Sequence, residues 1–150
     1  MSLLSSASLF HVGVVAKDID VAMAAFTKEL GVHWKGGYPL KMDVCVYGKP
    51  LSLEMRIAHT IEGEPHIELI QAIADTPWQV TRGREWHHLC YWSEEASELC
   101  QSLLDKGYAR VLGFPGEDSG YFQAPDGLLI EIINAKLYRD LSGWLSKSNK

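Results

Sequence analysis

Apolar and polar positions follow the same order twice along the chain. The first copy begins with LFHVGVV at Leu9, continues with KDIDVAMAAFTKELG and ends with PHIELIQ at Gln71. The second begins with WHHLCYW at Trp86, continues with SEEASELCQSLLDKG and ends with GLLIEII at Ile133. In each copy an apolar strand precedes an amphipathic helix and further strands. Because internal repetition indicates repeated structural units, we expect two βαβββ modules.

Capping residues support the two predicted helices. Asp18 is a suitable N-cap for a helix over Ile19 to Leu30, and Ser93 is one for a helix over Glu94 to Lys106. A glycine follows each helix and is suited to the left-handed conformation that ends it. The Asp126–Gly127 pair predicts a hairpin turn before the last strand.

The length suits one domain of the α+β class, with a curved mixed sheet. We place the first module at residues 9–74, the second at 85–134 and a C-terminal tail helix at 135–150. Pro77, Gly83 and several charges interrupt both patterns between the modules.

A histidine and a glutamate recur at equivalent places in the two copies. These are His11 and Glu68 in the first, and His88 and Glu131 in the second. Burying a carboxylate in an apolar strand is costly unless it is paired. If the glutamates face the same side as the histidines, the four side chains converge between the modules as a nitrogen and oxygen set suited to a divalent first-row metal. A single histidine or glutamate in such a strand is more often structural, but the repetition favours a site.

Composition and charge exclude several classes of partner. The chain has a net charge of −5 without a run of one sign, so we expect no nucleic-acid partner. No stretch is long and apolar enough for a membrane span, and the start lacks the basic segment of a signal peptide. Three cysteines match no zinc or redox spacing and are expected to be reduced. We therefore expect a cytoplasmic protein, and also a homodimer.

From Leu9 to about Asn134 the chain resembles the vicinal oxygen chelate superfamily, which includes glyoxalase I, methylmalonyl-CoA epimerase, bleomycin resistance proteins and extradiol dioxygenases. The resemblance lies in FHVGVV, HIELIQ, HHLCYW and PDGLLIEII. It implies a concave sheet that holds a divalent metal (Ni, Co, Mn, Zn or Fe), with His11, Glu68, His88 and Glu131 as ligands. The paired histidines and the segment lengths resemble the epimerases most, although epimerases commonly carry glutamine at the position of Glu68.

The expected function is a metal-dependent isomerase, epimerase or lyase that removes a proton beside a carbonyl of a small molecule with vicinal oxygens. Glu131 or Glu68 is the expected base, and the sequence leaves the choice open. One alternative is a metal-free binding protein of the bleomycin-resistance type. The other is an Fe(II) extradiol-type dioxygenase, which needs only two histidines and one carboxylate; Glu68 would fill a fourth position, and this favours the isomerase, epimerase or lyase.

The segment LSLEMRIAH shows two alternating faces. We expect its apolar face, which carries Met55 and Ile57, to contact a helix, and its polar face to look into the concave site. Arg56 and Glu54 on the polar face are then candidate substrate-binding residues, while a surface ion pair is the structural alternative. Trp78 and Trp86 flank the junction between the modules as packing residues or as the rim of a site.

Overall fold

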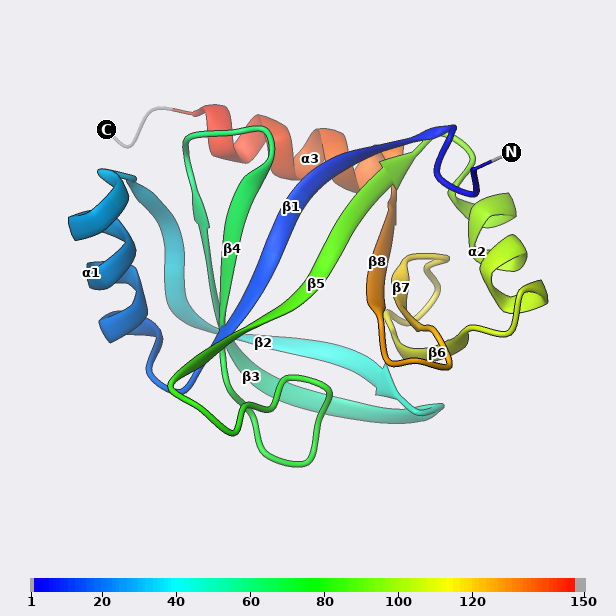
Figure 1. Ribbon diagram of the computed structural model, residues 1–150, viewed down its shortest axis with the longest axis horizontal. Helices are drawn as coiled ribbons and strands as arrows, with labels where there is room; N and C mark the ends of the chain where they lie inside the picture. The colour runs from blue at the N-terminus through cyan, green and yellow to red at the C-terminus, as the bar shows by residue number, and fades with distance from the viewer. Residues whose placement is uncertain (1, 148–150) are drawn as a thin grey trace.

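The computed structural model describes residues 2–147, in which eight strands form a closed barrel with three helices around it (Figure 1). The first repeat contains β1 (Ala7–Ala16), α1 (Ile19–Leu30), β2 (Trp34–Val46), β3 (Lys49–Thr60) and β4 (His66–Gln71). The second contains β5 (Arg84–Ser93), α2 (Ala96–Asp105), β6 (Ala109–Gly113), β7 (Gly120–Gln123) and β8 (Leu129–Asn134). The chain continues into α3 (Ala135–Ser146).

The strand order around the barrel is β1-β4-β3-β2-β6-β7-β8-β5, so the two repeats meet through their first strands. Strand β1 is parallel to β4 with Gly13 opposite Glu68, and β5 is parallel to β8 with Cys90 opposite Glu131. In both repeats the glutamate therefore lies opposite the residue two positions after the histidine. The α+β fold with a mixed sheet is confirmed.

The sheet closes, whereas the sequence indicated only a curved surface. Closure depends on a short contact between β2 and β6, in which Cys45 is opposite Gly113 and Val46 is opposite Leu112. The β2–β3 hairpin is long enough to pass beneath the other strands and reach that edge (Figure 1). Alternation of polar and apolar residues specifies the faces of a strand but not which sheet edges meet.

The first helix matches its prediction. The side chain of Asp18 accepts hydrogen bonds from the backbone N–H groups of Asp20 and Val21, and Gly31 is left-handed with φ of 70°. The second helix begins at Ala96, two residues later than expected. Ser93 still accepts a hydrogen bond from the N–H of Glu95, but it stabilises a turn there and not the first helical residue.

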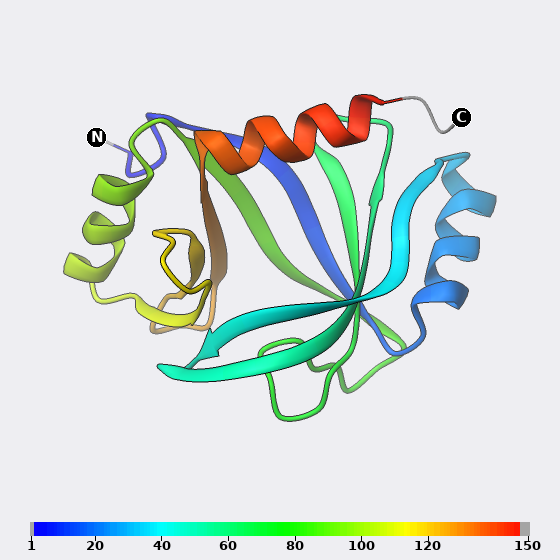
Figure 2. The same cartoon turned by 180° about the vertical axis from the view of Figure 1, so that it is seen from behind.

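The helices surround the barrel, with α1 and α2 at opposite flanks and α3 across one end (Figures 1 and 2). The apolar stripe of α3 packs with Phe10, Cys90 and Ile133. The Asp126–Gly127 turn joins β7 to β8 as predicted, with Gly127 at φ of 99°. No helix within residues 2–147 is both long and apolar enough to cross a bilayer.

The prediction about the faces of LSLEMRIAH was wrong. In β3, Met55, Ile57 and His59 face the barrel interior, where they line a cavity. Arg56 lies on the outer face and pairs with Asp20 of α1, at 2.7 Å between Nη2 and Oδ1. Glu54 shares the outer face and is exposed. The interior is largely apolar at this level, so the apolar face of β3 turns inward.

Candidate metal centre

Four buried side chains converge inside the barrel: His11, Glu68, His88 and Glu131. Oε1 of Glu131 lies 3.1 Å from Nε2 of each of the two histidines. Oε1 of Glu68 lies 3.3 Å from the same two nitrogens, which are 3.2 Å apart. The structure thus brings together the four residues that the repeat singled out. The two paired strands β1 and β5 supply the histidines, and their outer neighbours β4 and β8 supply the carboxylates.

These distances fit a divalent cation. Metal–ligand bonds of about 2.1 Å place neighbouring ligand atoms about 3.0 Å apart at right angles and about 3.4 Å apart in a tetrahedron. The five distances above lie between or close to these values. Nε2 of His11 and Nε2 of His88 face each other, and only one proton fits between them. Oε1 of Glu68 is buried and has no hydrogen-bond partner among the described residues. One cation would satisfy all four atoms together, so the residues fit such a group.

Gly13 makes room for His88. The two residues are opposite each other in the antiparallel β1–β5 pair. A Cβ atom at position 13 would lie 2.2 Å from Cε1 of His88, far inside van der Waals contact. The glycine two positions after His11 therefore allows the imidazole of the other repeat to approach the backbone of β1 closely.

His87 fixes the tautomer of His88. Nε2 of His87 lies 2.6 Å from the carbonyl oxygen of Pro77, which can only accept a hydrogen bond. A neutral His87 then accepts at Nδ1 from Nδ1–H of His88, 2.8 Å away. Burial and the neighbouring His88 lower the pKa of His87 to about 4, which keeps it neutral. His88 is left with a lone pair on Nε2, directed at the cluster.

The histidines and glutamates of the cluster shift one another's pKa values. Burial alone would raise the pKa of Glu131, but the two histidines outweigh it and hold the value at about 2. Burial likewise would lower the pKa of His88, but Glu131 and Glu68 outweigh it and raise that pKa above 6.5. Without a metal, the carboxylates are therefore ionised and favour protonated histidines. A cation at this point would replace those protons.

Two further residues at the cluster were not among the sequence candidates. His59 of β3 is buried, and its Nε2 lies 2.9 Å from Oε2 of Glu68 without hydrogen-bond geometry. The ring of Tyr121 lies 4.6 Å from that of His88, and its hydroxyl accepts a hydrogen bond from Trp78. The two residues occupy equivalent positions, because His59 is opposite Glu68 in the β3–β4 pair and Tyr121 is opposite Glu131 in the β7–β8 pair. Their residue types differ, so the repetition of histidine and glutamate did not reveal them.

The remaining candidates lie away from the cluster. Arg56 and Glu54 are on the outer face of β3, as described above, so the structure gives no support to substrate binding by either. Trp86 is exposed, whereas Trp78 is buried in the barrel interior. The three cysteines are free, and Cys90 and Cys100 are buried.

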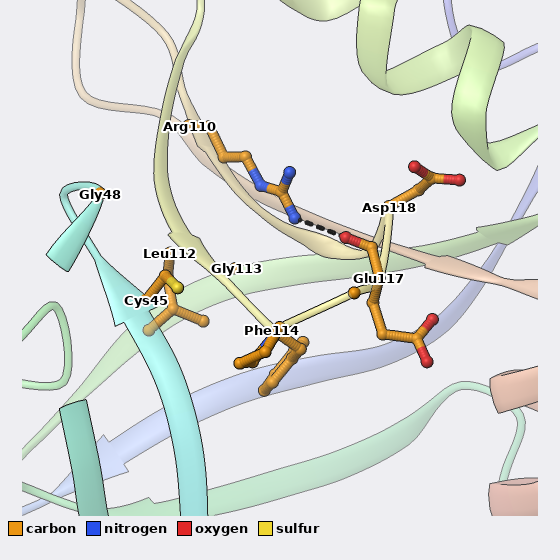
Figure 3. A pocket seen from close by; sticks show the side chains of 10 residues that line it. Cys45, Gly48, Arg110, Leu112, Gly113, Phe114, Glu117 and Asp118 are labelled. Atoms are coloured by element: carbon orange, nitrogen blue, oxygen red, sulfur yellow. Dashed lines mark hydrogen bonds between the residues drawn. The ribbon is translucent and has the colours of Figure 1, made fainter. Parts of the chain in front are cut away.

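Another cavity, of about 500 Å³, lies beside the loop of residues 114–118, and no residue of the cluster lines it (Figure 3). Its cation is Arg110, whose guanidinium donates hydrogen bonds to the carbonyl oxygens of Glu117 and Ser119. A Cβ atom at Gly113 would lie 2.7 Å from Nη2 of Arg110. The guanidinium of Arg110 is therefore hydrogen-bonded to the loop. The residues that line this cavity do not form a set of metal ligands like the four-residue cluster.

Comparisons with known proteins agree with the fold. Among solved structures, a hypothetical protein from Bacillus halodurans is 20% identical, with 87% of this chain and 95% of that chain covered and a TM-score of 0.62. A methylmalonyl-CoA epimerase from Mycobacterium tuberculosis is also 20% identical, with 87% and 90% covered and a TM-score of 0.56. A Streptomyces coelicolor methylmalonyl-CoA epimerase is 14% identical, with 85% and 93% covered and a TM-score of 0.59.

A search of curated proteins found no significant match. A family model described as the glyoxalase/bleomycin resistance protein/dioxygenase superfamily matches residues 10–122, which is most of the chain. The chain therefore belongs to the glyoxalase/bleomycin resistance protein/dioxygenase superfamily, as its repeated motifs indicated.

Proposed function

We propose that this protein is a divalent-metal-dependent isomerase, epimerase or lyase that removes a proton beside a carbonyl group of a small chelating molecule. The observation that carries the proposal is the convergence of two imidazole nitrogens and two carboxylate oxygens at ligand spacing. The similarity to methylmalonyl-CoA epimerases supports proton-transfer chemistry, and the metals common in the superfamily support the centre.

The four residues of the cluster would hold a cation, and one of the two carboxylates would also accept the proton. His11 and His88 present Nε2, and Glu68 and Glu131 present Oε1, to the same point. A bound divalent ion would polarise two neighbouring substrate oxygens and stabilise the negative charge left when the proton departs. Each carboxylate has a second oxygen that can accept the proton from carbon. Apolar surroundings exclude water and so protect the carbanion-like species from unwanted proton exchange.

Glutamine at the position of Glu68 is common among epimerases, which makes Glu131 our choice as the base. Replacing Glu131 with glutamine keeps an amide oxygen as a ligand but removes a base. We expect Glu131→Gln to bind the metal and to lower proton exchange about 100-fold or more, while Glu68→Gln retains most of it. The reverse pattern would assign the base to Glu68.

The experiment is incorporation of deuterium from heavy water into a panel of carbonyl compounds by metal-loaded protein. The panel contains 2-oxo acids, hemithioacetals, 2-hydroxy ketones and a methylmalonyl thioester, each tested with Ni²⁺, Co²⁺, Mn²⁺ and Zn²⁺. Exchange that requires metal and Glu131 supports the proposal. Absence of exchange across the panel, together with metal-independent ligand binding, would contradict it and favour the metal-free binding protein.

A further inference from the structure

The metal centre lies at one end of an apolar chamber of about 300 Å³. This volume is roughly that of ten water molecules. His11, Glu68 and Glu131 contribute to its wall at the centre. The rest of the wall is mainly apolar and includes Met42, Met55, Ile57, Trp78, Leu137 and Leu141.

Within residues 2–147, no lysine or arginine lines this chamber. The cations nearby are already engaged: Arg56 pairs with Asp20 outside the barrel, and Arg110 holds the loop of residues 114–118. Lys35 donates hydrogen bonds to the carbonyl oxygens of Trp144 and Lys147 at the end of α3. Besides the two glutamates of the centre, the charged residue in the wall is Glu117. An anionic group in the chamber away from the metal centre would lose its hydration without gaining a partner, which is costly.

His59 is a polar group of the wall with one ring nitrogen that has no partner. Its side chain is 7% exposed, Nε2 lies 2.9 Å from Oε2 of Glu68, and Nδ1 makes no hydrogen bond among the described residues. Its ring is nearly perpendicular to that of Trp144 of α3, and the residue lines the chamber with Glu68. A buried imidazole in this state has one N–H to donate, and a ligand oxygen would satisfy it.

A second apolar cavity, of about 320 Å³, adjoins the chamber and extends to β2 and α3. Both cavities are lined by Met42, Ile57, His59 and Leu141. Residues of β2 and α3 line this second cavity, and α3 lies across the end of the barrel (Figure 2). From the shared lining we infer that a ligand reaches the centre through it. No lysine or arginine lines this second cavity within the described residues. An acidic tail away from the metal centre would therefore find no lysine or arginine side chain in the wall of either cavity.

Building on the proposed function, we propose that the substrate is a small uncharged carbonyl compound with two neighbouring oxygens at one end and an apolar substituent. The oxygens face the metal centre, the substituent occupies the chamber, and His59 donates a hydrogen bond to a ligand oxygen. This class differs from substrates recognised through a phosphate or carboxylate tail, for which the chamber has no partner.

A pair of hydroxamic acids tests the proposal, because both present the same two vicinal oxygens. Hexanohydroxamic acid has an apolar chain, and adipic acid monohydroxamate carries a carboxylate at the end of a similar chain. We expect calorimetry on the full-length, metal-loaded protein to show at least tenfold tighter binding of the uncharged compound. Equal or tighter binding of the acidic compound to the unmodified protein would overturn the proposal.

Introducing a cation into the wall should change this preference. Leu141→Arg, on the half-buried face of α3, is expected to tighten binding of the acidic compound at least tenfold relative to the neutral one, and Leu137→Arg repeats the test one turn away. Leu104→Arg on α2, where the leucine is 40% exposed, is the matched control and should leave the preference unchanged. An unchanged preference in both folded α3 variants would place the ligand outside the chamber.

Metal binding is measured first, without a hydroxamate, so that the two proposals can fail separately. If metal does not bind, the proposed function fails, and the chamber is tested in metal-free protein with hexanamide and adipic acid monoamide. Calorimetry then reports binding. Preference for hexanamide supports the uncharged ligand class, and preference for the acidic amide overturns it.

Discussion

Gly13 shows how a residue without a side chain determines the geometry of the centre. Its missing Cβ leaves the space that the His88 ring occupies. Because His88 is pressed between β1 and Tyr121, it has little freedom to move away. The position of one ligand in the second repeat therefore depends on a residue of the first.

We predict that Gly13→Ala displaces the His88 imidazole and lowers metal affinity at least tenfold. The new methyl group would also cost about 1–3 kcal/mol of stability through overpacking. Gly143→Ala is the control, because position 143 lies in α3 and an added Cβ there meets no atom within 4 Å. The control should retain metal affinity and gain up to about 1 kcal/mol. Equal metal affinities of the two folded variants, measured by calorimetry, would contradict the role of Gly13.

The sequence predicts the four residues of the centre because the repeat places them in equivalent registers. It predicts neither His59 nor His87 as part of the site. The counterpart of His59 in the second repeat is Tyr121, a different residue type, so the two do not show as a repeated motif. The role of His87 depends on the carbonyl of Pro77, which belongs to the irregular segment between β4 and β5. The faces of β3 were inverted because alternation defines two faces without saying which one the closed barrel encloses.

Among the elements, the helices differ in how well local sequence determines their ends. Asp18 caps α1 with two hydrogen bonds, and the helix begins at the predicted residue. Ser93 has the same chemistry, but Glu94 and Glu95 remain in a turn before α2. The contact between β2 and β6, which closes the barrel, depends on the lengths of two distant strands and left no local signal.

Asp18→Ala should destabilise the protein by about 1 kcal/mol, because two backbone N–H groups at the start of α1 lose their acceptor. Urea denaturation measures this change. Metal affinity should remain within twofold of the unmodified protein, since α1 packs on the outer face of the barrel and contributes no side chain to the centre. A tenfold loss of metal affinity in the folded variant would show that α1 positions the site.

The molecule as a whole combines two equivalent repeats with an unequal interior. The repeats supply the symmetric centre between β1 and β5, whereas α3 and the β2–β3 hairpin enclose the apolar chamber on one side of it. The symmetric part is visible in the sequence as repetition. The asymmetric part, which would determine the substrate, becomes visible only when the barrel closes.

Metal binding should depend on pH in a defined direction. Glu131 and Glu68 raise the pKa of His88 above 6.5, so protonated His88 persists to higher pH than a free histidine. Protonated imidazole cannot ligate a metal, and affinity therefore falls as the pH decreases from 8 to 6. The decrease is at most about tenfold per pH unit for each proton displaced.

Calorimetric titration of Co²⁺ or Mn²⁺ into full-length protein freed of metal, at pH 8 and pH 6, tests the metal centre directly. We predict one equivalent bound per chain at pH 8 with weaker binding at pH 6, loss of binding in His11→Ala, and unchanged binding in the control His33→Ala, where the histidine is exposed and outside the cluster. Absence of saturable binding at pH 8, or equal binding by folded His11→Ala, would contradict the assignment of His11, Glu68, His88 and Glu131 as a metal centre.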